Sequence, residues 1–138
     1  MKGFSLEHLL RPAMIEQENG KSPAVFMLHG YGSNKDDLFS FASELPEKYA
    51  VISVQAPYSL SDTEYAWYSM ELDATRWSDI VQAYTTQRKL LIFIEQSCQK
   101  YSLDEQQITL LGFNQGCILS LSMALSFPKK IQKVIGIS

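Results

Sequence analysis

Residues 108–126 read ITLLGFNQGCILSLSMALS, and these residues carry the strongest fold signal in the chain. An apolar run over residues 108–111 passes through the pentapeptide GFNQG directly into a second apolar segment with helical character. A glycine on each side of Asn114 leaves room where a strand and a helix approach closely, and the central residue of so tight a turn is expected to have a positive φ. The helix that follows would point its free N–H groups and the positive end of its dipole toward the space above Asn114, a place to hold negative charge.

Strand signals recur along the rest of the chain. Short apolar runs, typical of strands buried on both faces of a parallel sheet, occupy residues 24–28, 50–54 and 133–137. Residues 4–10 alternate in part and stop before a proline, which indicates an outer strand.

Helical signals separate these strands. A helix capped by Ser33 or Asn34 is expected to end before Pro46, and apolar residues recur at helical spacing over residues 77–101. The helix at 117–125 is apolar nearly all round, which predicts that the sheet and its neighbours cover it. Strands that alternate with helices predict an α/β fold, with a mostly parallel sheet and helices on both faces.

Composition and charge limit the partners and the compartment. The length of 138 residues predicts a single domain over residues 1–138, and a net charge of -3 gives no electrostatic reason to bind nucleic acid or an anionic membrane. No apolar run reaches spanning length and no charged-then-apolar leader opens the chain, so a cytoplasmic protein is expected. Cys98 and Cys117 are interpreted as small core residues in a reducing compartment. Neither a metal nor a cofactor is expected, because no cluster of His, Cys and carboxylate residues has ligand spacing and residues 30–35 lack the third glycine of a dinucleotide-binding loop.

Two further motifs accompany the GFNQG turn. Residues 26–38 read FMLHGYGSNKDDL, a strand followed by a glycine-rich loop and a helix, and residues 56–58 read APY at the end of another strand. Together with residues 108–121, these motifs resemble the α/β-hydrolase phospholipase/carboxylesterase family, which includes acyl-protein thioesterases. The resemblance covers only the front part of that fold, so the domain is expected to be incomplete at its C-terminal end, truncated after the strand at 133–137.

The resemblance implies a reaction and a set of site residues. Family members transfer an acyl group from an ester or thioester to a serine and then to water, so a small-molecule or acyl-ester substrate is expected. The backbone N–H groups of Tyr31 and Gln115 correspond to the donors that hold the oxyanion. Asn114 stands at the nucleophile position, where the family has serine, and its amide has no ionisable hydroxyl with which to form an acyl-enzyme. The other motif residues are structural in the family pattern, and they are His29, Gly30, Gly32, Gly112 and Gly116.

The rest of the catalytic triad is missing from its usual order. In this fold the acid and the histidine follow the nucleophile, yet residues 115–138 contain no Asp, Glu or His. The only histidines are His8, expected at the surface of the outer strand, and His29 in the loop motif. The leading hypothesis is a carboxylesterase or thioesterase-type hydrolase that is inactive as this chain stands. The alternative is a non-catalytic protein that keeps the oxyanion hole to hold a carboxylate, acyl or sugar ligand, and a third hypothesis is deamidation of Asn114 to a carboxylate nucleophile.

Two regions outside the motifs carry expectations of their own. Residues 58–76 are rich in aromatic side chains and leave the sheet at the C-terminal end of a strand, where such folds bind ligands. Trp67 and Tyr68 are expected to line the acyl or alcohol pocket, although aromatic residues in a long loop pin that loop to the core about as often. The strand at 133–137 is expected to have an unpaired edge and uncovered apolar faces. More protein, or a second copy in a homodimer formed through this edge, would cover it.

Overall fold

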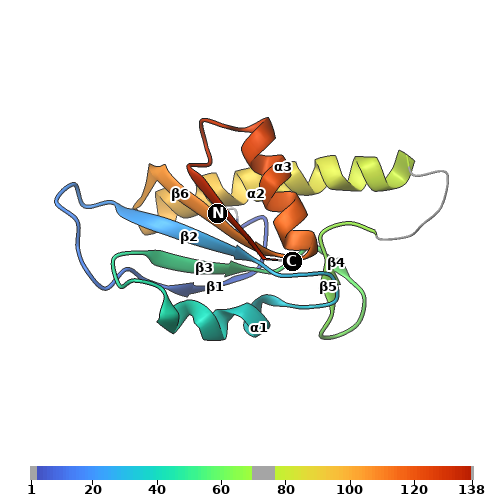
Figure 1. Ribbon diagram of the computed structural model, residues 1–138, viewed down its shortest axis with the longest axis horizontal. Coiled ribbons are helices and arrows are strands. Elements are labelled where there is room, and N and C mark those ends of the chain that lie inside the picture. The colour runs from blue at the N-terminus through green and yellow to red at the C-terminus, as the bar shows by residue number, and fades with distance from the viewer. Residues whose placement is uncertain (1–2, 70–76, 138) are drawn as a thin grey trace.

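The computed structural model describes residues 3–69 and 77–137, and a five-stranded sheet lies at its centre (Figure 1). The strands are β1 (His8–Arg11), β2 (Ser22–Leu28), β3 (Ala50–Val54), β6 (Leu103–Phe113) and β7 (Lys133–Ile137). Their order across the sheet is β1-β3-β2-β6-β7. β1 runs antiparallel to β3 and every other neighbouring pair is parallel, so the mostly parallel sheet is confirmed. A small hairpin of β4 (Tyr58–Ser59) and β5 (Tyr65–Ala66) forms a separate sheet.

Helices cover both faces of the sheet, as the alternation of signals predicts (Figure 1). α1 (Lys35–Phe39) continues into the 3-10 helix η1 (Ser40–Glu44) on one face, and α2 (Trp77–Tyr101) and α3 (Gln115–Ser126) lie on the other. Successive strand residues point to opposite faces, which is why continuous apolar runs mark these strands. On β2, Phe26 faces the larger core beneath α2 and α3, and Met27 faces the smaller core beneath α1. Among the described residues, no helix is both long and apolar enough to cross a membrane.

β6 is longer than its apolar run. The sequence indicates a strand at residues 108–111, whereas β6 begins at Leu103 and pairs there with Ser22 of β2. The polar residues at 104–107 hide this first half, because their side chains are exposed or half-buried and give no apolar signal. The apolar half pairs with β2 from Ile108 onward and carries the chain straight into the GFNQG turn.

The outer side of α3 and β7 is exposed. Ile118, Leu121 and Leu125 on α3 are 57%, 52% and 84% exposed, and Ile135 and Ile137 on β7 also lie at the surface. The predicted burial of this helix on all sides is therefore wrong, because the sheet covers only its inner side. β7 pairs with β6, and no other described strand pairs with it, so the expectation of an unpaired edge is confirmed. The expectation of uncovered apolar faces is confirmed only for the side that carries Ile135 and Ile137, because Val134 on the other side packs against the larger core.

Candidate active site

The turn between β6 and α3 has the strained backbone that its sequence predicts. Asn114 has φ 52° and ψ -115°, which lies outside even the small left-handed region that residues other than glycine visit. Its N–H donates to the carbonyl of Ile137 over 2.9 Å, and its own carbonyl accepts from the N–H groups of Cys117 and Ile118 at 2.9 and 3.1 Å. β7 and the first turn of α3 therefore hold this strained residue in place.

The flanking glycines are required by close approach rather than by their φ angles. A Cβ atom on Gly112 would overlap the carbonyl of Gly116, and a Cβ atom on Gly116 would overlap the carbonyl of Leu28 at the end of β2. α3 consequently begins directly against the end of β2. Asn114 is exposed at this junction, and its side-chain amide makes no hydrogen bond within the residues that the structure describes.

His29 is fully buried at the end of β2, and both of its ring nitrogens are engaged. Nε2 accepts the N–H of Ala56 over 3.0 Å, so the ring proton is on Nδ1, which lies 2.8 Å from the carbonyl oxygen of Gly30. Burial lowers the pKa of His29 below its ordinary value, which keeps the ring neutral. With both ring nitrogens engaged, His29 has no free lone pair with which to act as a base.

The N–H of Tyr31 belongs to the Gly30–Tyr31 peptide, whose carbonyl group is held by two hydrogen bonds. The carbonyl of Gly30 in the same peptide accepts from Nδ1 of His29 at 2.8 Å and from the N–H of Ser33 at 3.1 Å. In a trans peptide the N–H points away from the carbonyl, so these two bonds set the direction of the Tyr31 donor. A Cβ atom on Gly30 would lie 3.2 Å from Cβ and 3.3 Å from Nδ2 of Asn114, which places this peptide beside the Asn114 side chain.

Gln115 supplies the second backbone donor at the start of α3. Neither its N–H nor that of Tyr31 donates a hydrogen bond within residues 3–69 and 77–137. The Gln115 side chain is 2% exposed, with Oε1 accepting the N–H of Trp67 at 2.7 Å and Nε2 donating to the carbonyl of Tyr68 at 2.8 Å. Two unused donors thus flank Asn114, one from each of the two sequence motifs.

Trp67 does not line an open surface. Its side chain is fully buried, and Nε1 donates to the carbonyl of His29 over 2.8 Å. Its own carbonyl accepts from the hydroxyl of Thr86 in α2 over 2.6 Å. Trp67 therefore pins the aromatic segment to the core, the second of the two interpretations left open by the sequence. Tyr68 is half-buried beside it, and residues 70–76 of that segment lie outside the described residues.

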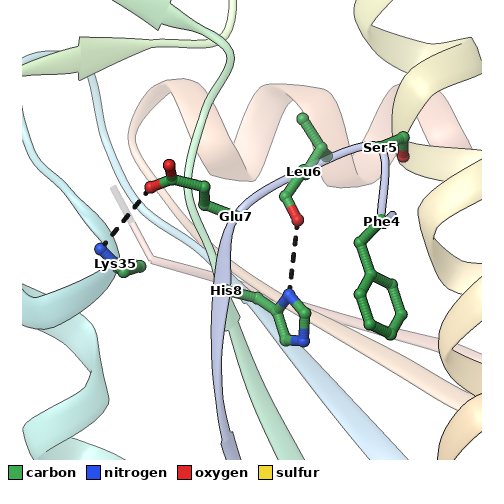
Figure 2. Close-up of a pocket in the computed structure, with 6 residues that line it drawn as sticks. All are labelled: Phe4, Ser5, Leu6, Glu7, His8 and Lys35. Atoms are coloured by element: carbon green, nitrogen blue, oxygen red, sulfur yellow. Dashed lines mark hydrogen bonds and ion pairs between the residues drawn. The ribbon is translucent and has the colours of Figure 1, made fainter. Parts of the chain in front are cut away.

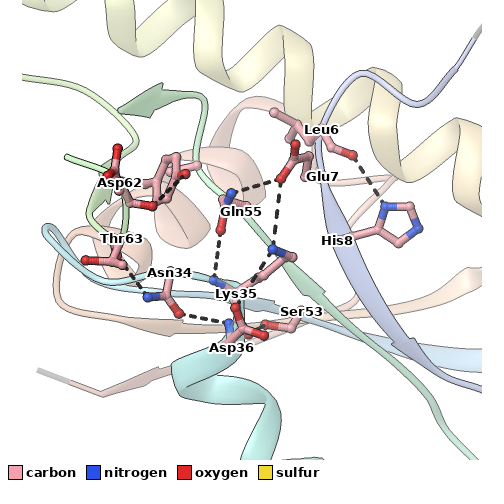
Figure 3. Close-up of polar contacts among 12 residues, drawn as sticks. Leu6, Glu7, His8, Asn34, Lys35, Asp36, Ser53, Gln55, Asp62 and Thr63 are labelled. Atoms are coloured by element: carbon pink, nitrogen blue, oxygen red, sulfur yellow. Dashed lines mark hydrogen bonds and ion pairs between the residues drawn. The ribbon is translucent and has the colours of Figure 1, made fainter. Parts of the chain in front are cut away.

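The hairpin and α1 hold the glycine-rich loop from outside. The N–H of Gly32, which has φ 81°, donates to the carbonyl of Tyr65 at 2.9 Å, and the N–H of Tyr65 donates to the carbonyl of Ser33 at the same distance. Nδ2 of Asn34 donates to the carbonyl of Thr63 at 2.9 Å, while Oδ1 of Asn34 caps α1 (Figure 3). The same figure shows Gln55 joining the N–H of Lys35 to the carboxylate of Glu7.

His8 lies in an aromatic cluster instead of at the surface where it was expected. Its ring is half-buried, with Nε2 2.7 Å from the Tyr101 hydroxyl and ring centroids 4.6 Å from Phe4 and 4.9 Å from Phe93. The sequence-based expectation is wrong because α2 covers this side of β1, a contact that the strand pattern alone does not reveal. β1 is separated from β6 by β3 and β2, three strand spacings or roughly 14 Å, so His8 cannot reach Asn114 as a base.

A hollow of about 480 Å³ lies over the start of β1 (Figure 2). Glu7 and Lys35 form an ion pair of 3.9 Å at its rim, and Nδ1 of His8 faces the carbonyl of Leu6. These polar groups are already paired with one another, and the hollow belongs to the far edge of the sheet from Asn114. In the described part of the chain, no group of three or more His, Cys, Asp or Glu residues is arranged to hold a metal ion.

The sequence analysis missed that the buried Gln115 side chain binds the main chain of Trp67 and Tyr68. The signal was a long polar residue at the first position of an otherwise apolar helix, where burial requires hydrogen-bond partners. The part played by Thr86 was also missed. It lies on the long amphipathic helix, and its partner is a main-chain carbonyl distant in sequence.

A sheet of this order with a strained strand-to-helix turn, and with two backbone donors beside it, defines an α/β hydrolase. The family model described as phospholipase/carboxylesterase matches residues 10–138. The chain belongs to the phospholipase/carboxylesterase family.

Solved structures agree on the fold. The carboxylesterase from Mesorhizobium loti is 18% identical with a TM-score of 0.81, and the match covers 99% of this chain and 62% of that protein. The Bacillus cereus carboxylesterase is 18% identical with a TM-score of 0.77, covering 95% of this chain and 58% of that one. Esterase PE8 is 25% identical with a TM-score of 0.75, covering 95% and 64%. This chain therefore spans less than two thirds of the length of each of these proteins, and no curated protein sequence matches it.

Proposed function

We propose that this chain carries the oxyanion-binding half of a carboxylic ester or thioester hydrolase. The observation that supports the proposal best is the strained Asn114 turn with a backbone N–H group unpaired on either side, from Tyr31 and from Gln115. In the family's reaction a serine hydroxyl at position 114 attacks the acyl carbonyl carbon, and the negative charge that develops on the carbonyl oxygen is held by these two donors. The alcohol or thiol then leaves, and water releases the acyl group as a carboxylic acid.

The chain as given lacks the groups that move protons and form the acyl bond. Asn114 has no hydroxyl, His29 has no free nitrogen, and His8 is at the other edge of the sheet. Loss of the nucleophile in such a triad costs roughly 10⁶-fold in kcat, and the oxyanion hole and binding retain roughly 10³ to 10⁴ over water. The chain is therefore a weak hydrolase at best, and its acid and base would have to come from outside residues 115–138.

The test restores the nucleophile and supplies the base. Asn114→Ser protein incubated with p-nitrophenyl butyrate and imidazole should gain one butyryl group, because imidazole can take the serine proton that no described histidine can reach. The Asn114→Ala variant is the control. Butyrylation of both variants at the same other sites, with position 114 unmodified in each, would refute the proposal.

A non-catalytic carboxylate-binding protein is the second candidate. It is favoured by the exposed Asn114 amide, whose Nδ2 could donate to a carboxylate that already accepts from the two backbone N–H groups. Tyr68 is proposed to form part of the wall of either site, because it is half-buried and the Gln115 side chain holds its main-chain carbonyl. Measurable butyrate binding by the unaltered chain supports this candidate, and its absence would count against it.

The partner and the compartment are also proposed. The exposed apolar residues of β7 and α3 would be covered by a second copy of the chain, paired edge to edge through β7. Cys98 and Cys117 are both free thiols, which supports a reducing compartment and hence the cytoplasm.

A further inference from the structure

Trp67 connects the two elements that carry the oxyanion donors. Its main-chain N–H donates to the Gln115 side chain at the start of α3, and its indole Nε1 donates to the carbonyl of His29 at the end of β2. Trp67 and His29 are 0% exposed and Gln115 is 2% exposed, so water does not compete for these hydrogen bonds.

Each end of this connection continues to a donor. At one end, the bonded Gln115 side chain belongs to the same residue as one of the two donors, the Gln115 backbone N–H. His29 directs the other, because its Nδ1 donates to the carbonyl of the peptide that contains the Tyr31 N–H. A continuous set of buried contacts therefore runs from one donor to the other through a single residue, Trp67, by its main-chain N–H on one side and its indole N–H on the other.

We infer that Trp67 and the side chain of Gln115 form a buried strut that sets the separation and direction of the two oxyanion N–H groups. The inference rests on the proposed oxyanion site and makes Trp67 a positioning residue. Direct packing of Gly116 against the carbonyl of Leu28 also holds α3 to β2. The strut adds the orientation that packing of a glycine cannot supply, since hydrogen bonds are directional and a glycine contact is not.

Two variants remove one end of the strut each. Trp67→Phe keeps an aromatic ring in the core and removes the indole N–H that reaches His29. Gln115→Met keeps a side chain of similar length and removes both bonds to residues 67 and 68. Gln87→Met is the matched control, because the Gln87 side-chain amide likewise bonds a group on another element, the Ser122 hydroxyl of α3 at 2.9 Å, and is not part of the strut.

The measurement is a butyrate titration of the whole chain followed by amide ¹H–¹⁵N resonances. In the unaltered protein, the amides of Tyr31 and Gln115 should move together with one dissociation constant. Loss of one buried hydrogen bond of ordinary strength should weaken butyrate binding about fivefold in Trp67→Phe, and loss of two should weaken it further in Gln115→Met. In Trp67→Phe the Tyr31 amide should lose its response while the Gln115 amide keeps part of it, and Gln87→Met should match the unaltered protein.

The outcomes separate the two proposals. If the unaltered protein shows no response at either amide, the oxyanion site fails. The strut is then judged in the absence of butyrate, where the Tyr31 resonance should still move in Trp67→Phe and stay in place in Gln87→Met. If butyrate binds and both strut variants bind it as tightly as the control, with both amides responding, the packing of Gly116 alone sets the geometry and the strut is refuted. If one variant fails to fold, the other decides the question by the same criterion.

Discussion

Replacing Asn114 by Gly and by Ala measures the strain stored in the turn. The Asn114 side chain makes no hydrogen bond within the described residues, so both replacements remove the same unbonded amide group, and glycine removes Cβ as well. They differ in the backbone, because glycine accepts φ 52° and ψ -115° and alanine, with its Cβ, does not. A residue held in such a sparsely populated region costs about 1–3 kcal/mol, and the greater freedom of glycine in the unfolded chain returns about 0.4–1 kcal/mol of that difference.

We therefore expect the free energy of unfolding of Asn114→Gly to exceed that of Asn114→Ala by about 1–2 kcal/mol. Urea denaturation followed by circular dichroism at one fixed pH supplies both values. Leu125, exposed in α3, provides the control pair: there the order should reverse, with alanine more stable than glycine by about 1 kcal/mol. Equal stability of the two Asn114 variants, or a more stable alanine variant, would show that the turn is not strained.

Two further predictions concern the edges of the sheet. Burial lowers the pKa of His8 below 6.5, so the unfolded chain binds the proton more readily than the folded protein. The contribution of neutral His8 to stability is therefore fully present above pH 6.5, and it is lost as the pH drops from there toward the folded-state pKa. Urea midpoints at about pH 8 and pH 5 should therefore differ more in the unaltered protein than in His8→Asn, and an equal difference would exclude His8 as a source. At the other edge, Ile135→Lys should shift a dimer toward monomer in sedimentation velocity, because a charge on an exposed edge strand opposes pairing, with Glu44→Lys as a control distant from β7. A monomer at every concentration of the unaltered chain would contradict the proposed homodimer.

The central part of the fold could be predicted because its signals are local. Each apolar run at 24–28, 50–54 and 133–137 lies within a strand of the sheet. The first two are buried on both faces, which requires apolar side chains on each face, whereas most residues of the third are exposed. The turn at Asn114 could be predicted because two glycines mark a place where backbones meet, and the overlaps at Gly112 and Gly116 are the physical reason.

The features that were missed depend on contacts between distant parts of the chain. His8 is half-buried because α2 covers it, and the α2 residues that contact it, Phe93 and Tyr101, lie more than eighty residues further along the chain. Trp67 is held in the core by hydrogen bonds to the carbonyl of His29 and to the side chain of Gln115. The aromatic composition of its segment alone could not distinguish a buried Trp67 from one that lines a pocket. The exposure of α3 likewise depends on which elements lie beside it, which its apolar pattern does not state.

The acyl-capture experiment requires the nucleophile position, both donors and an approach for the substrate at the same time, so it is the strictest test of the proposed oxyanion hole. After incubation of Asn114→Ser with p-nitrophenyl butyrate and imidazole, peptide mass mapping should find the butyryl group at position 114. The rate of labelling should fall in the double variant with Trp67→Phe, and Asn114→Ala should stay unlabelled at that position. A serine at position 114 that is present, folded and never acylated would contradict the claim that Tyr31 and Gln115 form an oxyanion hole around it.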